Sequence, residues 1–185
     1  KTLVDGSFGE IRASEEWTDD FLDWFNEENH TKKRELHPSN GHEWWREGSA
    51  RGRVFGGSIP SINHMQGTEY WISPDSGIFV LDIPEGQPGQ PMCLSMIDSL
   101  LADLDNLGVF KDISGLIIGR PYRFSDILSA DLQRIVMKYA GLYGYPILYN
   151  VNIGHCAPIV TLPLGVMVEM DSSRNLFRTM GAGVV

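Results

Sequence analysis

Residues 76–91 read SGIFVLDIPEGQPGQP, and the first half of this stretch predicts a buried strand. Four consecutive apolar residues, 78–81, are bounded by Gly77 and Pro84. A short apolar run with turn residues on both sides is typical of a strand that is covered on both faces. Asp82 follows at the carboxyl end of the run, where a carboxylate is costly to bury unless it is paired. The stretch therefore predicts a buried strand that ends in an acidic residue.

The segments downstream alternate between helical and strand patterns. Residues 92–107 repeat apolar residues at helical spacing, and residues 125–141 form a second amphipathic pattern. The remaining patterns are two strands, ISGLIIGRP at 113–121 and YPILYNV at 145–151, and a closing β-hairpin at 162–180. A strand, helix, strand, helix and strand followed by a hairpin predict an α/β domain with mixed strand pairing.

The residues upstream are predicted to form a helix, a loop and a short strand. Residues 14–25 carry apolar side chains close to helical spacing, which predicts a helix. Residues 26–41 are polar and contain proline and glycine near their end, which predicts a loop. A short strand is expected around 53–55. We assign residues 1–50 to an N-terminal arm and interdomain segment, and residues 51–185 to the domain proper.

Composition excludes several classes of function. The formal net charge of -9 argues against a general nucleic-acid binder and against adhesion to anionic membranes, since both need clustered basic residues. No apolar run approaches the ~20 residues that span a bilayer, and the first residues have no signal-peptide pattern. The two cysteines, Cys93 and Cys156, have no CxxC spacing, so we expect free thiols and a reducing, cytoplasmic location.

His155 lies in the stretch VNIGHCAPIVTLPLG at 151–165, directly after a predicted strand. Loops at the carboxyl ends of strands are where α/β folds place their sites. A pair of Asp82 and His155 would form two-thirds of a serine-hydrolase triad, in which the acid orients the imidazole. The alternatives are a structural histidine and an aspartate that caps a turn before Pro84, and the residues alone leave both open.

Other catalytic groups have little support in the sequence. No GxSxG elbow occurs, and Ser58 in GGSIP is equally a turn residue. Cys156 is adjacent to His155, and neighbouring residues on a strand point to opposite faces, which argues against a Cys–His dyad. The histidines show no HxH or HExxH spacing, and no glycine motif for a phosphate is present, so we expect neither a metal nor a cofactor.

Four strings occur in the order in which they are found in a known family. They are GSARGRVFGGSIPSINHMQGTEYW at 48–71, GIFVLDIPEGQPGQP at 77–91, GLIIGRP at 115–121 and YPILYNVNIGHCAPIVTLPLGVMVEMD at 145–171. On these strings the chain resembles the C-terminal domain of the LD-carboxypeptidases and their relatives, the microcin C7 self-immunity proteins. The resemblance covers nearly the whole chain from about Ile11 to Asp171, and the GRP element is more similar to the immunity branch.

Members of that family are serine peptidases whose Ser-Glu-His triad is spread over two domains. The resemblance implies that His155 is the triad histidine and that Asp82 of FVLD occupies the place of the family's glutamate, with Glu85 in reserve. Asp is one methylene shorter than Glu, so its carboxylate reaches the imidazole only if the backbone comes closer. Ser58 stands where the family usually has asparagine. The resemblance also implies a compact, barrel-like, swivelling β/β/α fold.

The resemblance leads to two hypotheses on function. In the first, the chain is the C-terminal domain of a serine carboxypeptidase, its serine lies in an N-terminal domain outside the chain, and the chain alone is inactive. The substrate would be a muropeptide from cell-wall recycling or a peptidyl-nucleotide, and the paired Trp44 and Trp45 would stack on an aromatic group or serve as core or interface anchors. The family allows for a homodimer. In the second hypothesis, the chain is a non-catalytic binding module with the same fold.

Overall fold

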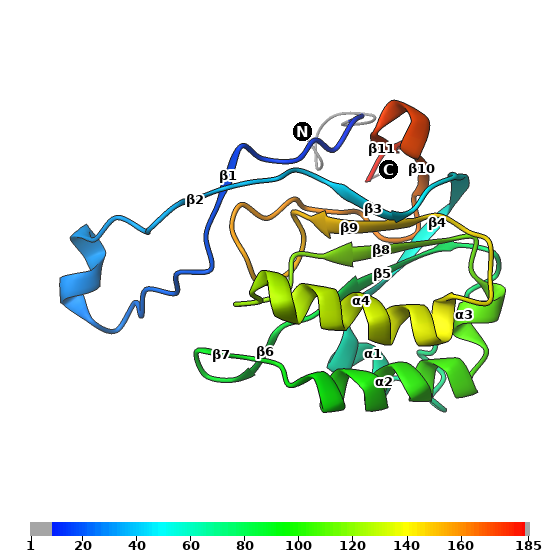
Figure 1. Cartoon of the computed structure of the whole chain (residues 1–185), viewed down its shortest axis with the longest axis horizontal. Helices are drawn as coiled ribbons and strands as arrows, with labels where there is room; N and C mark the ends of the chain where they lie inside the picture. Colours follow the sequence, from blue (N-terminus) through cyan, green and yellow to red (C-terminus); the bar gives the residue numbers. More distant parts are fainter. Residues whose placement is uncertain (1–8, 184–185) are drawn as a thin grey trace.

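The computed structural model describes residues 9–183, and a curled, mixed seven-stranded sheet is its centre (Figure 1). The strand order is β11-β10-β4-β5-β8-β9-β3, in which β4, β5, β8 and β9 are parallel to one another. The outer strands β3, β10 and β11 pair antiparallel. The strands are β3 (Glu43–Arg46), β4 (Ser49–Ser58), β5 (Ile78–Asp82), β8 (Gly115–Gly119), β9 (Ile147–Val151), β10 (Met167–Asp171) and β11 (Leu176–Thr179).

The helices cover one face of the sheet (Figure 1). They are α1 (Ile59–His64), α2 (Leu94–Asn106), α3 (Val109–Asp112) and α4 (Asp126–Ala140). Within β5, Phe79 and Leu81 pack against this helical layer, whereas Ile78 and Val80 belong to a second core that includes Phe177. Successive strand residues point to opposite faces, so a four-residue apolar run fills two cores.

The predicted fold class is confirmed, because the mixed sheet curls into a half-barrel with helices on one side. The strands expected from 78–81, 113–121 and 145–151 are present, and so are the helices expected over 92–107 and 125–141. The closing hairpin is formed by β10 and β11. Both cysteines are free thiols, as expected. None of the helices in the described part of the chain is both long and apolar enough for a membrane span.

The helix predicted over residues 14–25 is wrong. Residues Glu16–Trp17 instead form β1, which pairs antiparallel with β2 (His37–Pro38), and the chain between them makes only a 3-10 helix, η1 (Glu27–Thr31). An amphipathic helix needs a surface on which to bury its apolar face. Phe25 is 98% exposed here, so the segment has no such surface.

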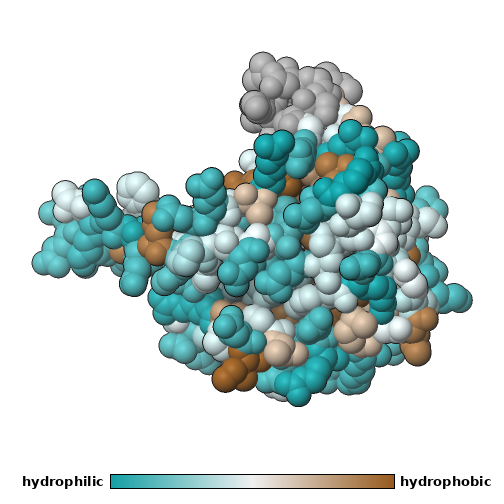
Figure 2. Space-filling view, turned by 45° about the horizontal axis from the view of Figure 1, so that its top comes forward, coloured by the Kyte–Doolittle hydropathy of each residue, from teal (hydrophilic) through white to brown (hydrophobic). Residues whose placement is uncertain are grey.

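Residues 15–42 form the arm, which projects from the domain in both views (Figures 1 and 2). The arm contacts the domain directly after β1, where Thr18 and Ala157 exchange two backbone hydrogen bonds of 2.8 Å each. The proposed boundary at residue 50 stays a prediction, and β3, which precedes it, already belongs to the sheet.

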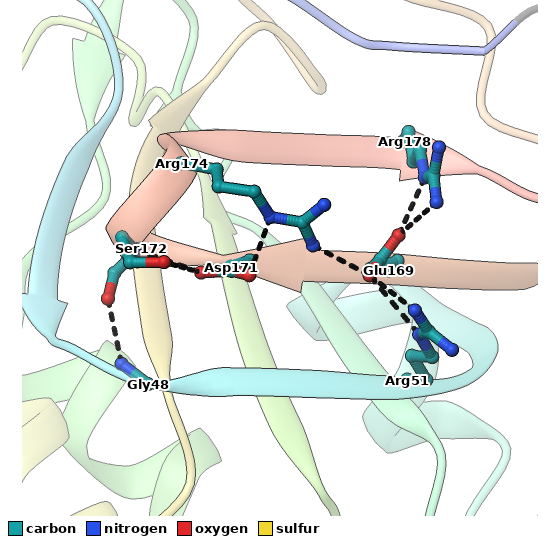
Figure 3. Close-up of polar contacts among 8 residues, drawn as sticks. Gly48, Arg51, Glu169, Asp171, Ser172, Arg174 and Arg178 are labelled. Carbon is teal, nitrogen blue, oxygen red and sulfur yellow. Dashed lines mark hydrogen bonds and ion pairs between the residues drawn. The ribbon is translucent and has the colours of Figure 1, made fainter.

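Glu169 of β10 holds three strands together (Figure 3). Its carboxylate, which is 4% exposed, accepts hydrogen bonds from Arg51 of β4, from Arg178 of β11 and from Arg174. These charge-assisted bonds lower the pKa of Glu169 to about 2, with the contribution of Arg51 the largest. The cluster therefore fixes β10 between its neighbours, away from the cavities described below.

A small hairpin of β6 (Glu85–Gln87) and β7 (Gln90–Pro91) follows β5.

Candidate active site

Asp82 and His155 meet at the carboxyl edge of the parallel strands. Asp82 is the last residue of β5, and His155 lies in the loop after β9, two strands away in the sheet. Nδ1 of His155 is 2.8 Å from Oδ2 of Asp82. The aspartate side chain is 8% exposed and the histidine side chain 43% exposed. The contact therefore joins a buried acid to an imidazole that is open to the surface.

Gly154 explains how the shorter acid reaches the ring. Its φ of +98° lies in a region that favours glycine, and a Cβ at this position would overlap Oδ1 of Asp82. The histidine loop can therefore approach the carboxylate only because residue 154 has no side chain. This close approach lets a side chain as short as aspartate reach the ring.

Burial sets the electrostatics of the pair. Desolvation raises the pKa of Asp82, while the charge of His155 and the hydrogen bond from its ring act in the opposite direction. Oδ1 of Asp82 is buried and has no hydrogen-bond partner within the described residues. The carboxylate thus depends on His155 for compensation, and Nδ1–H of the ring is directed to Oδ2. When the ring is neutral, this tautomer leaves Nε2 without a proton and able to accept one.

A cavity of about 410 Å3 opens beside His155. The histidine loop contributes Gly154 and Ala157 to its lining, and the arm contributes Phe21 and Arg34. We call this the His155 cavity. Its lining also includes the carboxylates of Asp19, Asp20 and Glu85, so the imidazole shares the cavity with one arginine, three acids and apolar side chains.

The reserve acid, Glu85, lies in the same cavity but apart from the imidazole. It is exposed in β6, and no ion pair joins it to His155 in residues 9–183. Ser58 is the register partner of Asp82 in the parallel pair β4–β5, so it too lies at this edge of the sheet. Asp82 is therefore the acid in contact with the histidine.

The two tryptophans singled out in the sequence lie on opposite faces of β3, away from the His155 cavity. Nε1 of Trp44 donates to Oδ1 of Asn175 at 2.9 Å, and its ring packs on the second core. Trp45 stacks on Tyr149 with ring centroids 4.1 Å apart. Their predicted role in substrate binding stays a prediction.

Cys156 does not form a dyad with His155. The thiol is buried and directed to the carbonyl oxygen of Pro121 at 3.7 Å. Burial raises its pKa to about 12, which keeps the thiol protonated at neutral pH. No group of three or more potential metal ligands occurs within residues 9–183.

Sequence reasoning missed the contribution of the arm. Phe21 and Arg34 reach the His155 cavity because Thr18 pairs with Ala157, a contact between residues far apart in the chain. No local pattern reports such a contact. The dipeptide Gly154-His155 was the available signal for the close approach to Asp82, since a glycine before a functional residue often marks tight backbone packing.

Comparisons with known proteins identify a matching family and several similar proteins. The family profile described as LD-carboxypeptidase C-terminal domain matches residues 51–170. The putative carboxypeptidase YocD of Bacillus subtilis is 33% identical over 163 residues, which cover 88% of this chain and 47% of that protein. The microcin C7 self-immunity protein MccF of Escherichia coli is 26% identical over 159 residues, which cover 85% of this chain and 44% of that protein.

Solved structures of similar proteins share the fold. An MccF-like protein from Bacillus anthracis matches with a TM-score of 0.79 and 27% identity, covering 94% of this chain and 51% of that chain. The inactive mutant of MccF in its apo state matches with a TM-score of 0.78 and 20% identity, covering 100% of this chain and 52% of that chain. The chain thus spans about half the length of the relatives that it matches.

Proposed function

Because this chain belongs to the LD-carboxypeptidase C-terminal domain family, we propose that it supplies the histidine and the acid of a Ser-acid-His triad for amide hydrolysis. His155 is the general base and Asp82 the orienting acid. The serine comes from a nucleophile domain, which is the chain's partner in the reaction. The observation that carries this proposal is the 2.8 Å contact between Nδ1 of His155 and Oδ2 of Asp82.

The proposed reaction begins with proton transfer from the serine hydroxyl to Nε2 of His155. The serine oxygen attacks the carbonyl carbon of the substrate amide, and Asp82 stabilises the imidazolium that forms. The imidazolium then gives its proton to the amide nitrogen as the C–N bond breaks, which leaves an acyl-enzyme. Water, deprotonated by His155, hydrolyses the acyl-enzyme and restores the serine.

Among the residues that line the His155 cavity, Arg34 favours a substrate cleaved near a free carboxylate, whereas Asp19, Asp20 and Glu85 repel a carboxylate placed close to them. Arg34 is the cationic residue of the arm in that cavity, and a guanidinium binds a carboxylate with two parallel hydrogen bonds. Two substrate classes fit this chemistry. One is a muropeptide, as in the murein peptide carboxypeptidase named among the relatives, and the other is a peptidyl-nucleotide, as in the complex of MccF with aspartyl sulfamoyl adenosine.

The test is to reassemble a two-domain enzyme. This chain is fused to the half of the Bacillus subtilis relative that it does not match, and hydrolysis of a muropeptide and of a peptidyl-adenylate analogue is measured. We expect turnover by the fusion and none by the chain alone. His155→Ala should abolish turnover in the fusion, whereas Glu85→Gln, in the same cavity, should retain it.

Two results would contradict the proposal. A folded fusion in which His155→Ala keeps full activity would remove the histidine from the mechanism. A folded fusion that binds either substrate but does not turn it over would favour the alternative, a non-catalytic binding module.

A further inference from the structure

A second cavity, of about 480 Å3, lies between the arm and α4. It opens at the carboxyl ends of β8 and β9, where α/β sheets bind ligands, and its volume is in the range of small-molecule sites. It has no lining residue in common with the His155 cavity in the described part of the chain. We call it the Arg120 cavity.

Arg120 is a buried cation that forms no ion pair in the described part of the chain. Its residue is 7% exposed, Nη2 donates to Oγ of Ser39 at 3.1 Å, and Cζ lies 4.5 Å from the ring centroid of Trp17. No carboxylate within residues 9–183 forms an ion pair with it. A guanidinium has five N–H donors, and a buried charge is stable when an anion compensates it. The Arg120 cavity therefore has a place for the anionic group of a ligand.

Aromatic rings form the apolar part of the same cavity. Trp17 comes from β1, Trp45 from β3 and Tyr149 from β9. Trp45 and Tyr149 are nearly parallel, with an interplanar angle of 20°, and Trp17 is held by the guanidinium. Because Trp45 and Tyr149 cover one face of each other and Arg120 covers one face of Trp17, a planar ligand would contact the remaining faces and edges of these rings. Packing already fixes the rings, so that contact has little entropic cost.

Two acids complete the lining. Glu43 lies on β3, and Asp126 is the first residue of α4. Burial raises the pKa of Glu43, Arg120 acts to lower it and Asp126 acts to raise it further, so the three charges lie within electrostatic reach of one another. The Arg120 cavity thus presents one cation and two carboxylates beside aromatic walls.

We propose that the Arg120 cavity binds a free aromatic α-amino acid, with its carboxylate on Arg120, its ammonium near Glu43 and Asp126, and its ring against Trp17, Trp45 and Tyr149. A zwitterion places an opposite charge next to Arg120 and next to the two carboxylates. A simple anion would be repelled by the carboxylates, and a simple cation would be repelled by Arg120. The site is separate from the proposed peptidase chemistry and holds the ligand without reaction.

The experiment is a titration of the chain with L-phenylalanine, followed by tryptophan fluorescence excited where phenylalanine does not absorb. Trp17 and Trp45 report on the cavity directly. 3-Phenylpropionate lacks the ammonium and phenethylamine lacks the carboxylate, so each is expected to bind at least roughly tenfold more weakly than L-phenylalanine. Arg120→Gln should weaken L-phenylalanine binding by roughly tenfold or more, and exposed Arg134→Gln should leave it unchanged.

Further variants separate this site from the others. Glu43→Gln, a change at an exposed position, should weaken binding of L-phenylalanine but not of 3-phenylpropionate. This variant tests the proposal even if Arg120→Gln does not fold. His155→Ala should leave binding unchanged. The proposal is overturned if millimolar L-phenylalanine gives no saturable signal, if the three compounds bind equally, or if His155→Ala abolishes the signal.

Discussion

The two oxygens of the Asp82 carboxylate have different surroundings. Oδ2 bonds the imidazole, while Oδ1 is buried against Gly154 with no hydrogen-bond partner in the described residues. Within the described residues, the contact with Nδ1 of His155 is therefore the one polar interaction that compensates the burial of this carboxylate. At the scale of single residues, Asp82 and His155 therefore act as a unit. A substitution of Asp82 or of Gly154 is expected to act through the orientation of the His155 ring.

We predict that Asp82→Asn lowers kcat of the reassembled enzyme by roughly 10²–10⁴-fold. An amide of the same shape can donate to the ring nitrogen that faces it, so the proton of the imidazole moves to Nε2 and the base is lost. Nitrogen NMR of His155 should show the change of tautomer. If kcat stays near that of the unmodified protein while the tautomer changes, the orienting role of Asp82 is refuted.

We predict that Gly154→Ala breaks the contact between Asp82 and His155. The new Cβ overlaps Oδ1 of Asp82, and φ of +98° is strained for alanine, so we expect a loss of about 2 kcal/mol or more in the free energy of unfolding. The control is Gly67→Ala, where φ is +72° but no atom lies within 4 Å. Denaturant unfolding of both variants separates the cost of backbone strain, which both share, from the cost of the overlap with Asp82, which only Gly154→Ala has. Equal losses in the free energy of unfolding would contradict a role for the close approach of residue 154 to Asp82.

At the scale of elements, most of the sheet and its helices could be predicted, and the arm could not. The strands 78–82 and 115–119 consist mostly of apolar residues because both of their faces are covered, so the local sequence alone indicates that they are buried. Residues 14–25 carry apolar side chains as well, but their structure depends on a distant partner, His37 for Trp17 and Ala157 for Thr18. Periodicity reports a local pattern and contains nothing about such pairings.

The same distinction applies to the candidate site. The ends of two apolar strands mark Asp82 and His155 as candidates, since parallel strands bring their carboxyl ends to one edge. The residues alone leave structural roles open for both, and it is the family resemblance that pairs them. The cavity beside them could not be predicted, since Phe21 and Arg34 come from the arm. The arm contacts the histidine loop through residues far apart in the chain, and such tertiary contacts leave no local pattern in the sequence.

We predict that the Glu169 cluster makes the sheet sensitive to acid. The pKa of Glu169 is lowered from 4.5 to about 2, so its stabilising effect is fully present above pH 4.5 and is lost as the pH falls towards 2. Glu169→Gln should lower the unfolding midpoint at neutral pH and flatten its dependence on pH in this window. Glu69→Gln, at an exposed position without an ion pair in the described residues, should do neither. Parallel pH profiles for Glu169→Gln and the unmodified chain would contradict this role.

At the scale of the whole molecule, the arm can be separated from the stability of the domain. Its projecting part contributes little to the cores, because Phe21, Trp24 and Phe25 are 71%, 77% and 98% exposed and η1 has no buried residue. Its two ends lie together, since Trp17 pairs with His37 and the backbone N–H of Glu35 donates to Asp20 at 3.3 Å. A short loop can therefore join residues 20 and 35.

We predict that replacing residues 21–34 by a short Gly/Ser loop leaves the fold intact and impairs substrate binding. The sheet, the pairing of Thr18 with Ala157 and the contact between Asp82 and His155 all lie outside the deletion, so the free energy of unfolding should change by less than about 1 kcal/mol. The His155 cavity loses Phe21 and Arg34, so KM of the reassembled enzyme should rise roughly tenfold or more while kcat changes little. Phe25→Ala, outside the cavity, is the matched control and should retain KM. If the deletion lowers kcat and leaves KM unchanged, the arm acts on the position of the histidine loop and does not hold the substrate.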